Sequence, residues 1–146
     1  MTKALSASLA VFLLATALSS LARGDTIPPC ALPNGVAAKS LENDAPPALL
    51  RALSERVGEI VPPGGRFDAT DVLVTGKNRR LIFVWNAGQR WIVATEHGGR
   101  GYNDPIFVYD LSDDGRTATL VLERLAFPNT VCTTATRLVG FESQRP

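Results

Sequence analysis

Residues 79 to 125 contain four short runs of apolar and β-branched residues, joined by connectors only a few residues long. Runs of this length, bounded by turn-forming residues, are typical of β-strands. Connectors this short join antiparallel neighbours, because a parallel pair needs a crossover of a dozen or more residues. This pattern constrains the fold more than any other feature of the chain, and it predicts an antiparallel meander. The four runs lie at 79–85, 90–96, 105–111 and 116–125.

Two further segments extend the pattern to five or six strands. Residues 67–76 (FDATDVLVTG) come before the meander, and residues 130–139 (TVCTTATRLV) come after it. The second segment is rich in β-branched residues, which favour strands. Successive turns of a meander alternate between its two ends. We therefore expect the turns at 86–89 and 112–115 to share one end, opposite residues 97–104.

A single helix is predicted before the meander. From Leu49 onward, apolar residues recur at spacings of three and four and would form one face of a helix. Asn43 or Asp44 is the expected N-cap, and the two prolines that follow, at 46 and 47, are tolerated in a first turn. The sequence VPPGG at 61–65 ends the helix.

The predicted fold class is α+β, with one N-terminal helix packed on a curled antiparallel β-meander of five or six strands. The runs at 81–85 and 105–111 are apolar on both faces, and one helix cannot cover both sides of a wide sheet. The sheet should therefore curl into a small half-barrel or fold over itself as a sandwich. Trp85 and Trp91 are expected in the core, since Trp is usually largely buried, with an exposed aromatic pair as the alternative.

The start of the chain has the three-part pattern of a secretory signal peptide. Lys3 gives a positive start, an apolar run reaches Leu21, and small residues precede a possible cleavage after Ala22. A retained membrane helix is the alternative. The domain organisation that follows is a signal peptide at 1–22, an extended leader at 23–47 and a single α+β domain at 48–146.

Two cysteines, Cys30 and Cys132, remain after this cleavage. An exported chain meets an oxidising compartment, so the even count predicts a disulfide between them. The alternative is a free catalytic cysteine, for which His97 would be the only histidine able to act as a base. The predicted location is periplasmic or extracellular.

Net charge argues against two classes of partner. The full chain has 15 basic and 14 acidic residues, and cleavage removes only Lys3 among them. A chain with no net charge has no general attraction for nucleic acid or for an anionic membrane. We expect no nucleic-acid partner and no stable membrane insertion after cleavage.

The segment TEHGGRGYND, residues 95–104, is the strongest candidate for a binding site. It joins two predicted strands, and loops held by a rigid frame often carry binding groups. Three glycines allow tight backbone paths, and an arginine offers donors for an anion. We expect His97, Arg100 and Tyr102 to contact a partner. The alternative is that these residues only form the connection between strands.

Most catalytic templates are missing from the sequence. There is no G-x-S-x-G, a lone histidine is too few for a zinc site, and GGRG is followed by a strand rather than a helix. We therefore predict no catalytic residue, no metal and no cofactor. The alternative is a small hydrolase that uses Glu96, His97 and Asp104 as acid and base groups.

These features predict an exported, non-catalytic binding or accessory protein. Its partner would be another protein or a component of the cell envelope. The small hydrolase is one alternative function, and a purely structural subunit is the other. The sequence predicts no particular oligomeric state.

Overall fold

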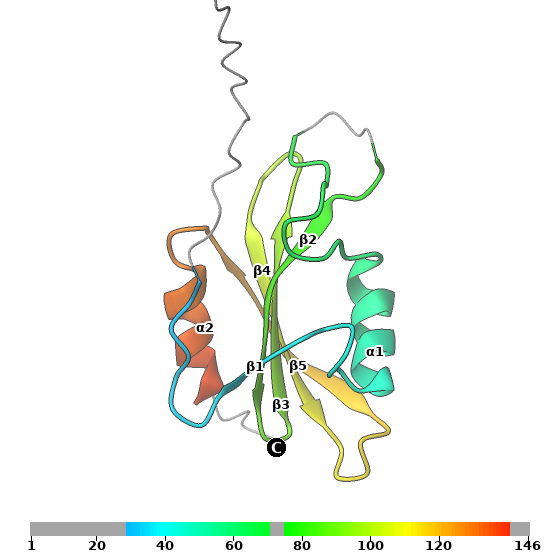
Figure 1. Ribbon diagram of the computed structural model, residues 1–146, viewed down its shortest axis with the longest axis vertical. Helices are drawn as coiled ribbons and strands as arrows, with labels where there is room; N and C mark the ends of the chain where they lie inside the picture. The colour runs from blue at the N-terminus through cyan, green and yellow to red at the C-terminus, as the bar shows by residue number, and fades with distance from the viewer. Residues whose placement is uncertain (1–28, 71–74, 141–146) are drawn as a thin grey trace, which may run out of the picture.

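The structure is a computed structural model, and it describes residues 29–70 and 75–140. The predicted signal peptide at 1–22 lies outside the described residues, as does the beginning of the predicted leader. Five strands and two helices are present in this part of the chain (Figure 1). In chain order they are β1 (Ala37–Lys39), α1 (Pro47–Val57), β2 (Arg79–Ala87), β3 (Arg90–His97), β4 (Asp104–Leu111), β5 (Ala118–Ala126) and α2 (Val131–Val139).

The strands form one antiparallel meander in the order β1-β2-β3-β4-β5. This confirms the α+β class and the four strands expected between residues 79 and 125. The turns at 86–89 and 112–115 share one end of the sheet, as expected. There the Gln89 side-chain amide donates to a carboxylate oxygen of Asp113 at 2.5 Å, and the Leu111 amide donates to the Gln89 carbonyl at 3.0 Å.

The predicted last strand at 130–139 is wrong, because this segment is the helix α2. Its buried residues are Val131, Ala135 and Leu138, at spacings of four and three, which place them on one helix face. Its β-branched residues suggested a strand, but the apolar spacing has the period of a helix. Packing of that face against the sheet outweighs the weak local preference of Thr and Val for strands.

The predicted curling of the sheet is also wrong, and α2 is the reason. The two helices lie on opposite sides of the sheet (Figure 1). On one face, α1 packs with Val84, Trp91 and Phe107, and on the other, α2 packs with Trp85 and Ile92. Both tryptophans are buried, which confirms the prediction that they belong to the core. Because a helix covers each face, the sheet does not have to curl to bury its apolar side chains, and it stays open.

Two segments before β2 also differ from expectation: the predicted leader and the predicted strand at 67–76. Part of the predicted leader is the short edge strand β1, which pairs with β2. The predicted strand at 67–76 is not a strand in its described parts, 67–70 and 75–76, and residues 71–74 lie outside the described residues. The five-strand count is therefore reached with β1 in place of the strand expected at 67–76.

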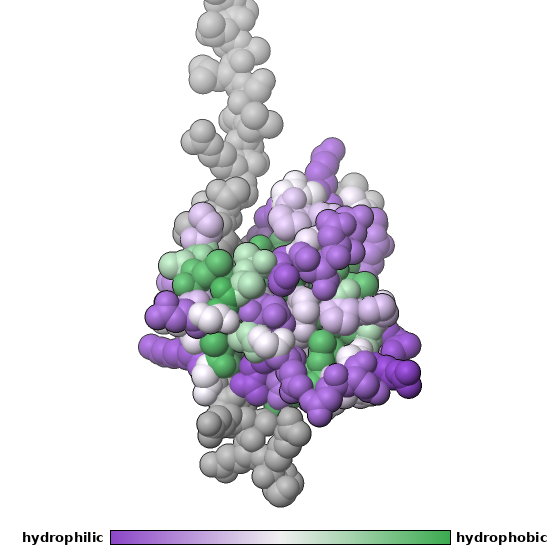
Figure 2. Space-filling model, turned by 60° about the horizontal axis from the view of Figure 1, so that its bottom comes forward, coloured by the Kyte–Doolittle hydropathy of each residue, from purple (hydrophilic) through white to green (hydrophobic). Residues whose placement is uncertain are grey.

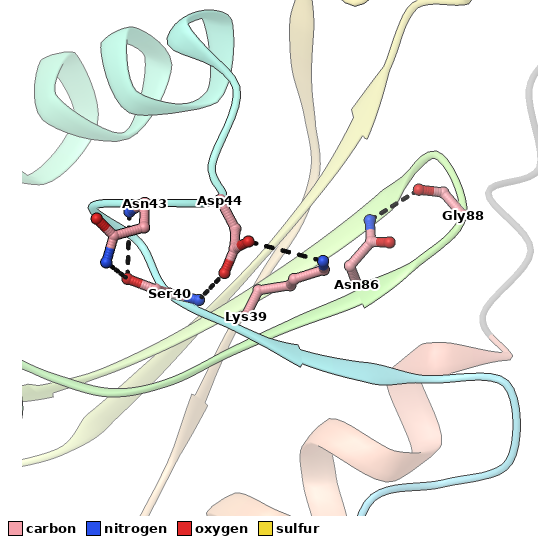
Figure 3. A network of polar contacts seen from close by, with 6 residues as sticks. All are labelled: Lys39, Ser40, Asn43, Asp44, Asn86 and Gly88. Carbon is pink, nitrogen blue, oxygen red and sulfur yellow. Dashed lines mark hydrogen bonds and ion pairs between the residues drawn. The ribbon is translucent and has the colours of Figure 1, made fainter.

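The start of α1 differs in one detail from the prediction. Helix α1 begins as expected at the prolines, but its N-cap position is Pro46, and neither Asn43 nor Asp44 caps it. The Asp44 carboxylate instead accepts a hydrogen bond from the Ser40 amide at 2.7 Å, and Asn43 donates to the Ser40 hydroxyl (Figure 3). The Lys39 Nζ atom lies 3.8 Å from a carboxylate oxygen of Asp44. These contacts close a tight turn between β1 and α1.

Cys30 and Cys132 form a disulfide, as the sequence predicted. The bond ties the segment before β1 to the second residue of α2, across 102 positions of sequence. A structural disulfide is typical of an oxidising compartment. Among the described residues, no helix combines the length and the apolar character that crossing a membrane requires.

Candidate functional site

The predicted binding segment lies at the end of the sheet opposite the 86–89 and 112–115 turns. β3 ends at His97 and β4 begins at Asp104, and the residues between them form the connection, here called the 97–104 turn. His97 and Asn103 close it with two backbone hydrogen bonds, of 2.8 and 3.3 Å. Gly99 and Gly101 both have positive φ, which glycine adopts without strain. Part of the glycine pattern is therefore a requirement of the turn itself.

Glu96 is the centre of a polar cluster beside this turn. Only 5% of its surface is exposed, and it lies opposite Arg80 of β2 in the sheet register. Arg80 contacts one carboxylate oxygen with both Nε, at 2.7 Å, and Nη2, at 2.5 Å. The Tyr102 hydroxyl donates to the other oxygen. Both oxygens of this buried carboxylate are thus bound, as a buried charge requires.

A β-bulge in β2 creates this pairing. The register shifts by one position between Leu81 and Phe83, so that Arg80 lies opposite Glu96. Continuing the register of the other half of the hairpin would place Arg80 opposite His97 instead. Arg80 also stacks over the Phe67 ring, with the guanidinium carbon 4.4 Å from the ring centre. The bulge therefore redirects one cation onto the buried carboxylate, which is a common use of bulges.

Asp104 lies across from Glu96 on the neighbouring strand. The Ala94–Ile106 and His97–Asn103 pairs on either side set this register, so both carboxyl groups lie on the α2 face of the sheet. Asp104 is fully buried, and neither of its oxygens has a hydrogen-bond partner among the residues that the structure describes. Burial, and then repulsion by Glu96, raise the pKa of Asp104 to about 7. The neutral acid is thus the main form of Asp104 below about pH 7.

His97 is separated from this acidic pair. Neighbouring residues of a strand point to opposite faces, so His97 lies on the other side of the sheet from Glu96. Its Nε2 lies 3.3 Å from the side-chain nitrogen of Asn78. Burial and then the nearby Arg79 lower the pKa of His97. The three residues of the predicted acid–base alternative therefore do not form one cluster: Glu96 and Asp104 share a face, and His97 does not.

The three predicted binding residues are also dispersed. Tyr102 is half-buried and directed inward to Glu96, and burial followed by this contact raises the pKa of its hydroxyl. Arg100 is exposed at the tip of the turn. His97 is half-buried on the opposite face. Of the three, Arg100 is therefore the side chain presented to solvent, while Tyr102 holds the turn onto the sheet.

A second loop supports the 97–104 turn from the side. Gly98 is so close to this loop that a Cβ atom on it would be 2.0 Å from the Asp68 carbonyl oxygen. The Asp68 carboxylate is itself bound by the amides of Thr75 and Gly76, at 2.7 to 3.0 Å. The Gly98 amide donates to the Asn78 carbonyl at 2.9 Å. Sequence reasoning missed both Asp68 and Arg80, because each lies far from the turn in the chain.

Two exposed apolar residues next to this end of the sheet were also missed. Leu125 and Phe127 are 62% and 61% exposed, the highest values among the large hydrophobic residues that the structure describes. They flank Ala126, which pairs with Asp104 at the base of the turn. Exposed aromatic residues such as Phe127 are enriched in protein-binding surfaces. The sequence held a weak signal for them, since Leu125 ends the strand predicted at 116–125 and Phe127 follows two residues later.

The structure also contains a groove away from the predicted site. It has a volume of about 750 Å³ and lies between the β1–α1 turn, the segment at 60–63 and residues 81–84 of β2. The Ser40–Asp44 contacts of Figure 3 hold one wall, and apolar residues such as Leu41, Ile60 and Phe83 line much of the rest. None of the residues predicted for binding lies in it.

Comparison with protein-family models, with curated proteins and with solved structures finds no match to this chain. Its possible chemistry thus follows from its own residues. In residues 29–70 and 75–140 there is no cluster of three or more His, Cys, Asp or Glu side chains that could hold a metal ion. The 97–104 turn is a well-supported loop with an exposed arginine. Beneath it lie two buried acids: Glu96 accepts hydrogen bonds at both oxygens, and Asp104 has a raised pKa.

Proposed function

We propose that this protein is an exported, non-catalytic binding or accessory protein that works in a periplasm or outside the cell. Its partner is a protein of that compartment, which it contacts through the 97–104 turn. The Cys30–Cys132 disulfide supports the oxidising compartment. Residues 1–22 carry the pattern of an export signal.

The observation that carries this proposal is the contrast between the base of the turn and its tip. Beneath the turn, Tyr102 and Arg80 bind Glu96, and Gly98 packs against the neighbouring loop. At the tip, Arg100 is exposed to solvent. A loop that is ordered before it binds loses less conformational entropy on binding. This arrangement suits a preformed contact surface.

The exposed pair Leu125 and Phe127 extends the same surface. Arginine and aromatic residues are enriched among the residues that dominate binding energy in protein interfaces. The opposite end of the molecule carries the 86–89 and 112–115 turns. Figure 2 brings that end forward, and hydrophilic residues cover much of its surface on the side of α1 and of the β4–β5 turn. Apolar contact area beside the 97–104 turn therefore favours a protein partner at this end.

The same contacts count against the hydrolase alternative. A general acid or base must reach the substrate. Glu96 already accepts hydrogen bonds at both oxygens, Asp104 is fully buried, and His97 lies on the opposite face. The remaining alternative, a purely structural subunit, differs from the proposal in its response to changes at the tip of the turn.

The test uses two exposed arginines at opposite ends of the molecule. A photo-crosslinking residue is placed at position 100, and in a second variant at position 116, where the Arg116 side chain is 87% exposed. The proposal predicts a defined protein partner that crosslinks from position 100 in the exported fraction and not from position 116. The partner is then purified and its affinity measured.

Arg100→Ala should weaken binding of that purified partner by about tenfold or more, which corresponds to about 1.4 kcal/mol. Arg116→Ala should leave the affinity unchanged, and both variants should keep the melting temperature of the parent. Equal effects of the two variants, or a loss of stability with Arg100→Ala alone, would assign the turn a purely structural role.

A further inference from the structure

We propose that the proton on Asp104 controls the 97–104 turn: the turn is held in its ordered form while Asp104 is neutral, and it loosens when Asp104 ionises. Protonation would thereby switch partner binding, a consequence that rests on the function proposed above. The loosening itself is a property of the chain alone and can be measured without a partner.

The geometry beneath the turn accommodates one negative charge and not two. Glu96 and Asp104 lie opposite each other on neighbouring strands and on the same face. Like charges in this position repel each other strongly, and a buried carboxylate without donors is costly. Glu96 has three donor contacts, whereas neither oxygen of Asp104 has one among the described residues.

The charged groups around Asp104 do not compensate a second charge. From β2, Arg80 is already bound to Glu96, and from the turn itself, Tyr102 donates to Glu96. The nearest charged residue on β5 on this face is Arg124, which is exposed. The charged residue of α2 is Arg137, which is also exposed. Charge on Asp104 would therefore have to compete with Glu96 for Arg80 and Tyr102.

That competition connects the proton to the turn. Tyr102 belongs to the turn, and its bond to Glu96 fastens the turn to the sheet. If ionised Asp104 attracts Arg80 or displaces Glu96, this bond weakens and the turn is held only by its backbone contacts. The pKa of Asp104, raised to about 7 by burial and by Glu96, places this change near neutral pH. The ordered form then prevails on the acidic side and the loose form on the alkaline side.

The first experiment measures hydrogen exchange of the amides of His97, Gly98 and Asn103, each of which donates a backbone bond at the turn. Exchange rates are divided by the intrinsic rate at each pH, so that only the opening of the turn remains. We expect opening to rise at least fivefold between pH 6 and pH 8.5 in the parent chain. Asp104→Asn, which mimics the neutral acid, should abolish the rise.

The matched control is Asp113→Asn, at the exposed turn on the opposite end of the sheet, which should keep the parent's rise. His97 is present in every variant, so its own titration cannot explain a difference between them. A rise that persists in Asp104→Asn would overturn the inference. So would an Asp104 carboxyl that titrates below pH 5 in the NMR spectrum of the parent chain, a measurement that needs no variant.

The binding arm separates this inference from the proposed function. Affinity for the partner identified by crosslinking should fall at least fivefold from pH 6 to pH 8.5, and Asp104→Asn should remove that fall. If the turn loosens with pH but no partner crosslinks from position 100, the proposed function is contradicted and the switch is supported. Binding at position 100 without any pH-dependent loosening would contradict the switch and leave the function in place.

Discussion

At the scale of single residues, Glu96 and Asp104 show how the surroundings decide the state of one functional group. Both lie in the segment that the sequence singled out, and their burial depends on contacts made elsewhere. Arg80 reaches Glu96 only because of the bulge between Leu81 and Phe83. A one-residue shift of this kind leaves no clear mark in the alternation of the strand. The sequence could therefore indicate the segment, but not which of its acids is charged.

Replacing Asp104 should make the protein more stable in alkaline solution. The pKa of Asp104 is about 7 in the folded chain, above its ordinary value of 3.8. Between these values the folded state binds more protons than the unfolded state. The free energy of unfolding therefore falls as pH rises from about 4 to about 7 and stays at the lower level above it. Asp104→Asn should remove this fall, with a gain on the order of 4 kcal/mol at most above pH 8.

Urea unfolding of the parent and of Asp104→Asn at pH 5 and at pH 8.5 checks this expectation. The advantage of Asp104→Asn should be present at pH 5, because part of the fall already lies below that pH, and it should be clearly larger at pH 8.5. A parent chain that gains stability from pH 5 to pH 8.5 by as much as the variant would show that Asp104 is already ionised at pH 5.

Removing Arg80 should destabilise the fold because it leaves the Glu96 charge buried without its cation. We expect Arg80→Met to lower the free energy of unfolding by about 2–4 kcal/mol, since breaking a buried ion pair from one side is costly. Lys77→Met is the matched control. It breaks the exposed pair between Lys77 and Glu59, which should cost less than about 1 kcal/mol. Similar urea midpoints for the two variants would show that the Arg80–Glu96 pair contributes little to the free energy of unfolding.

At the scale of elements, local pattern predicted some segments and failed at others for physical reasons. The strands β2 to β5 and the helix α1 have clear periods and clear breaks, so their positions were predicted to within a few residues. Helix α2 has a mixed signal, because Val and Thr favour strands while its apolar spacing is helical. Strand β1 is only three residues long and depends on pairing with β2, which no local pattern shows.

The close packing of the 97–104 turn against the loop at residue 68 gives a prediction for Gly98. In Gly98→Ala the new methyl group would be 2.0 Å from the Asp68 carbonyl and 2.7 Å from the Ala69 Cα. Backbone atoms must move to relieve such contacts, so we expect a loss of about 2 kcal/mol or more. At Gly140 an added Cβ would meet no other described residue within 4 Å beyond its chain neighbours, so Gly140→Ala should change stability by less than about 0.5 kcal/mol.

Thermal unfolding of these two alanine variants provides the measurement. If Gly98→Ala melted at the temperature of Gly140→Ala, the turn and the loop could not be packed as closely as described. The support that the proposed binding surface receives from this loop would then be absent.

At the scale of the whole molecule, the second helix decides between a curled and an open sheet. The prediction of a curled sheet assumed a single helix. Because the strands are apolar on both faces, one helix would have left one face of a flat sheet uncovered. With α1 on one face and α2 on the other, each face has its own cover. The disulfide also joins the start of α2 to the segment before β1. The crosslink that the sequence predicted thus connects two segments that pack against the same face of the sheet.

Removing the disulfide should therefore weaken the α2 face more than the α1 face. We expect Cys30→Ser/Cys132→Ser to lower the free energy of unfolding by about 2–5 kcal/mol, the usual cost of losing a disulfide from a small exported domain. Without the crosslink α2 has fewer constraints, so exchange should rise first for amides of α2. Helix α1 is fastened independently, through Leu49 and Leu53 and through the Arg56–Glu123 pair. Hydrogen exchange of both helices in the double variant measures this directly, and equal acceleration in α1 and α2 would show that the two faces unfold as one unit.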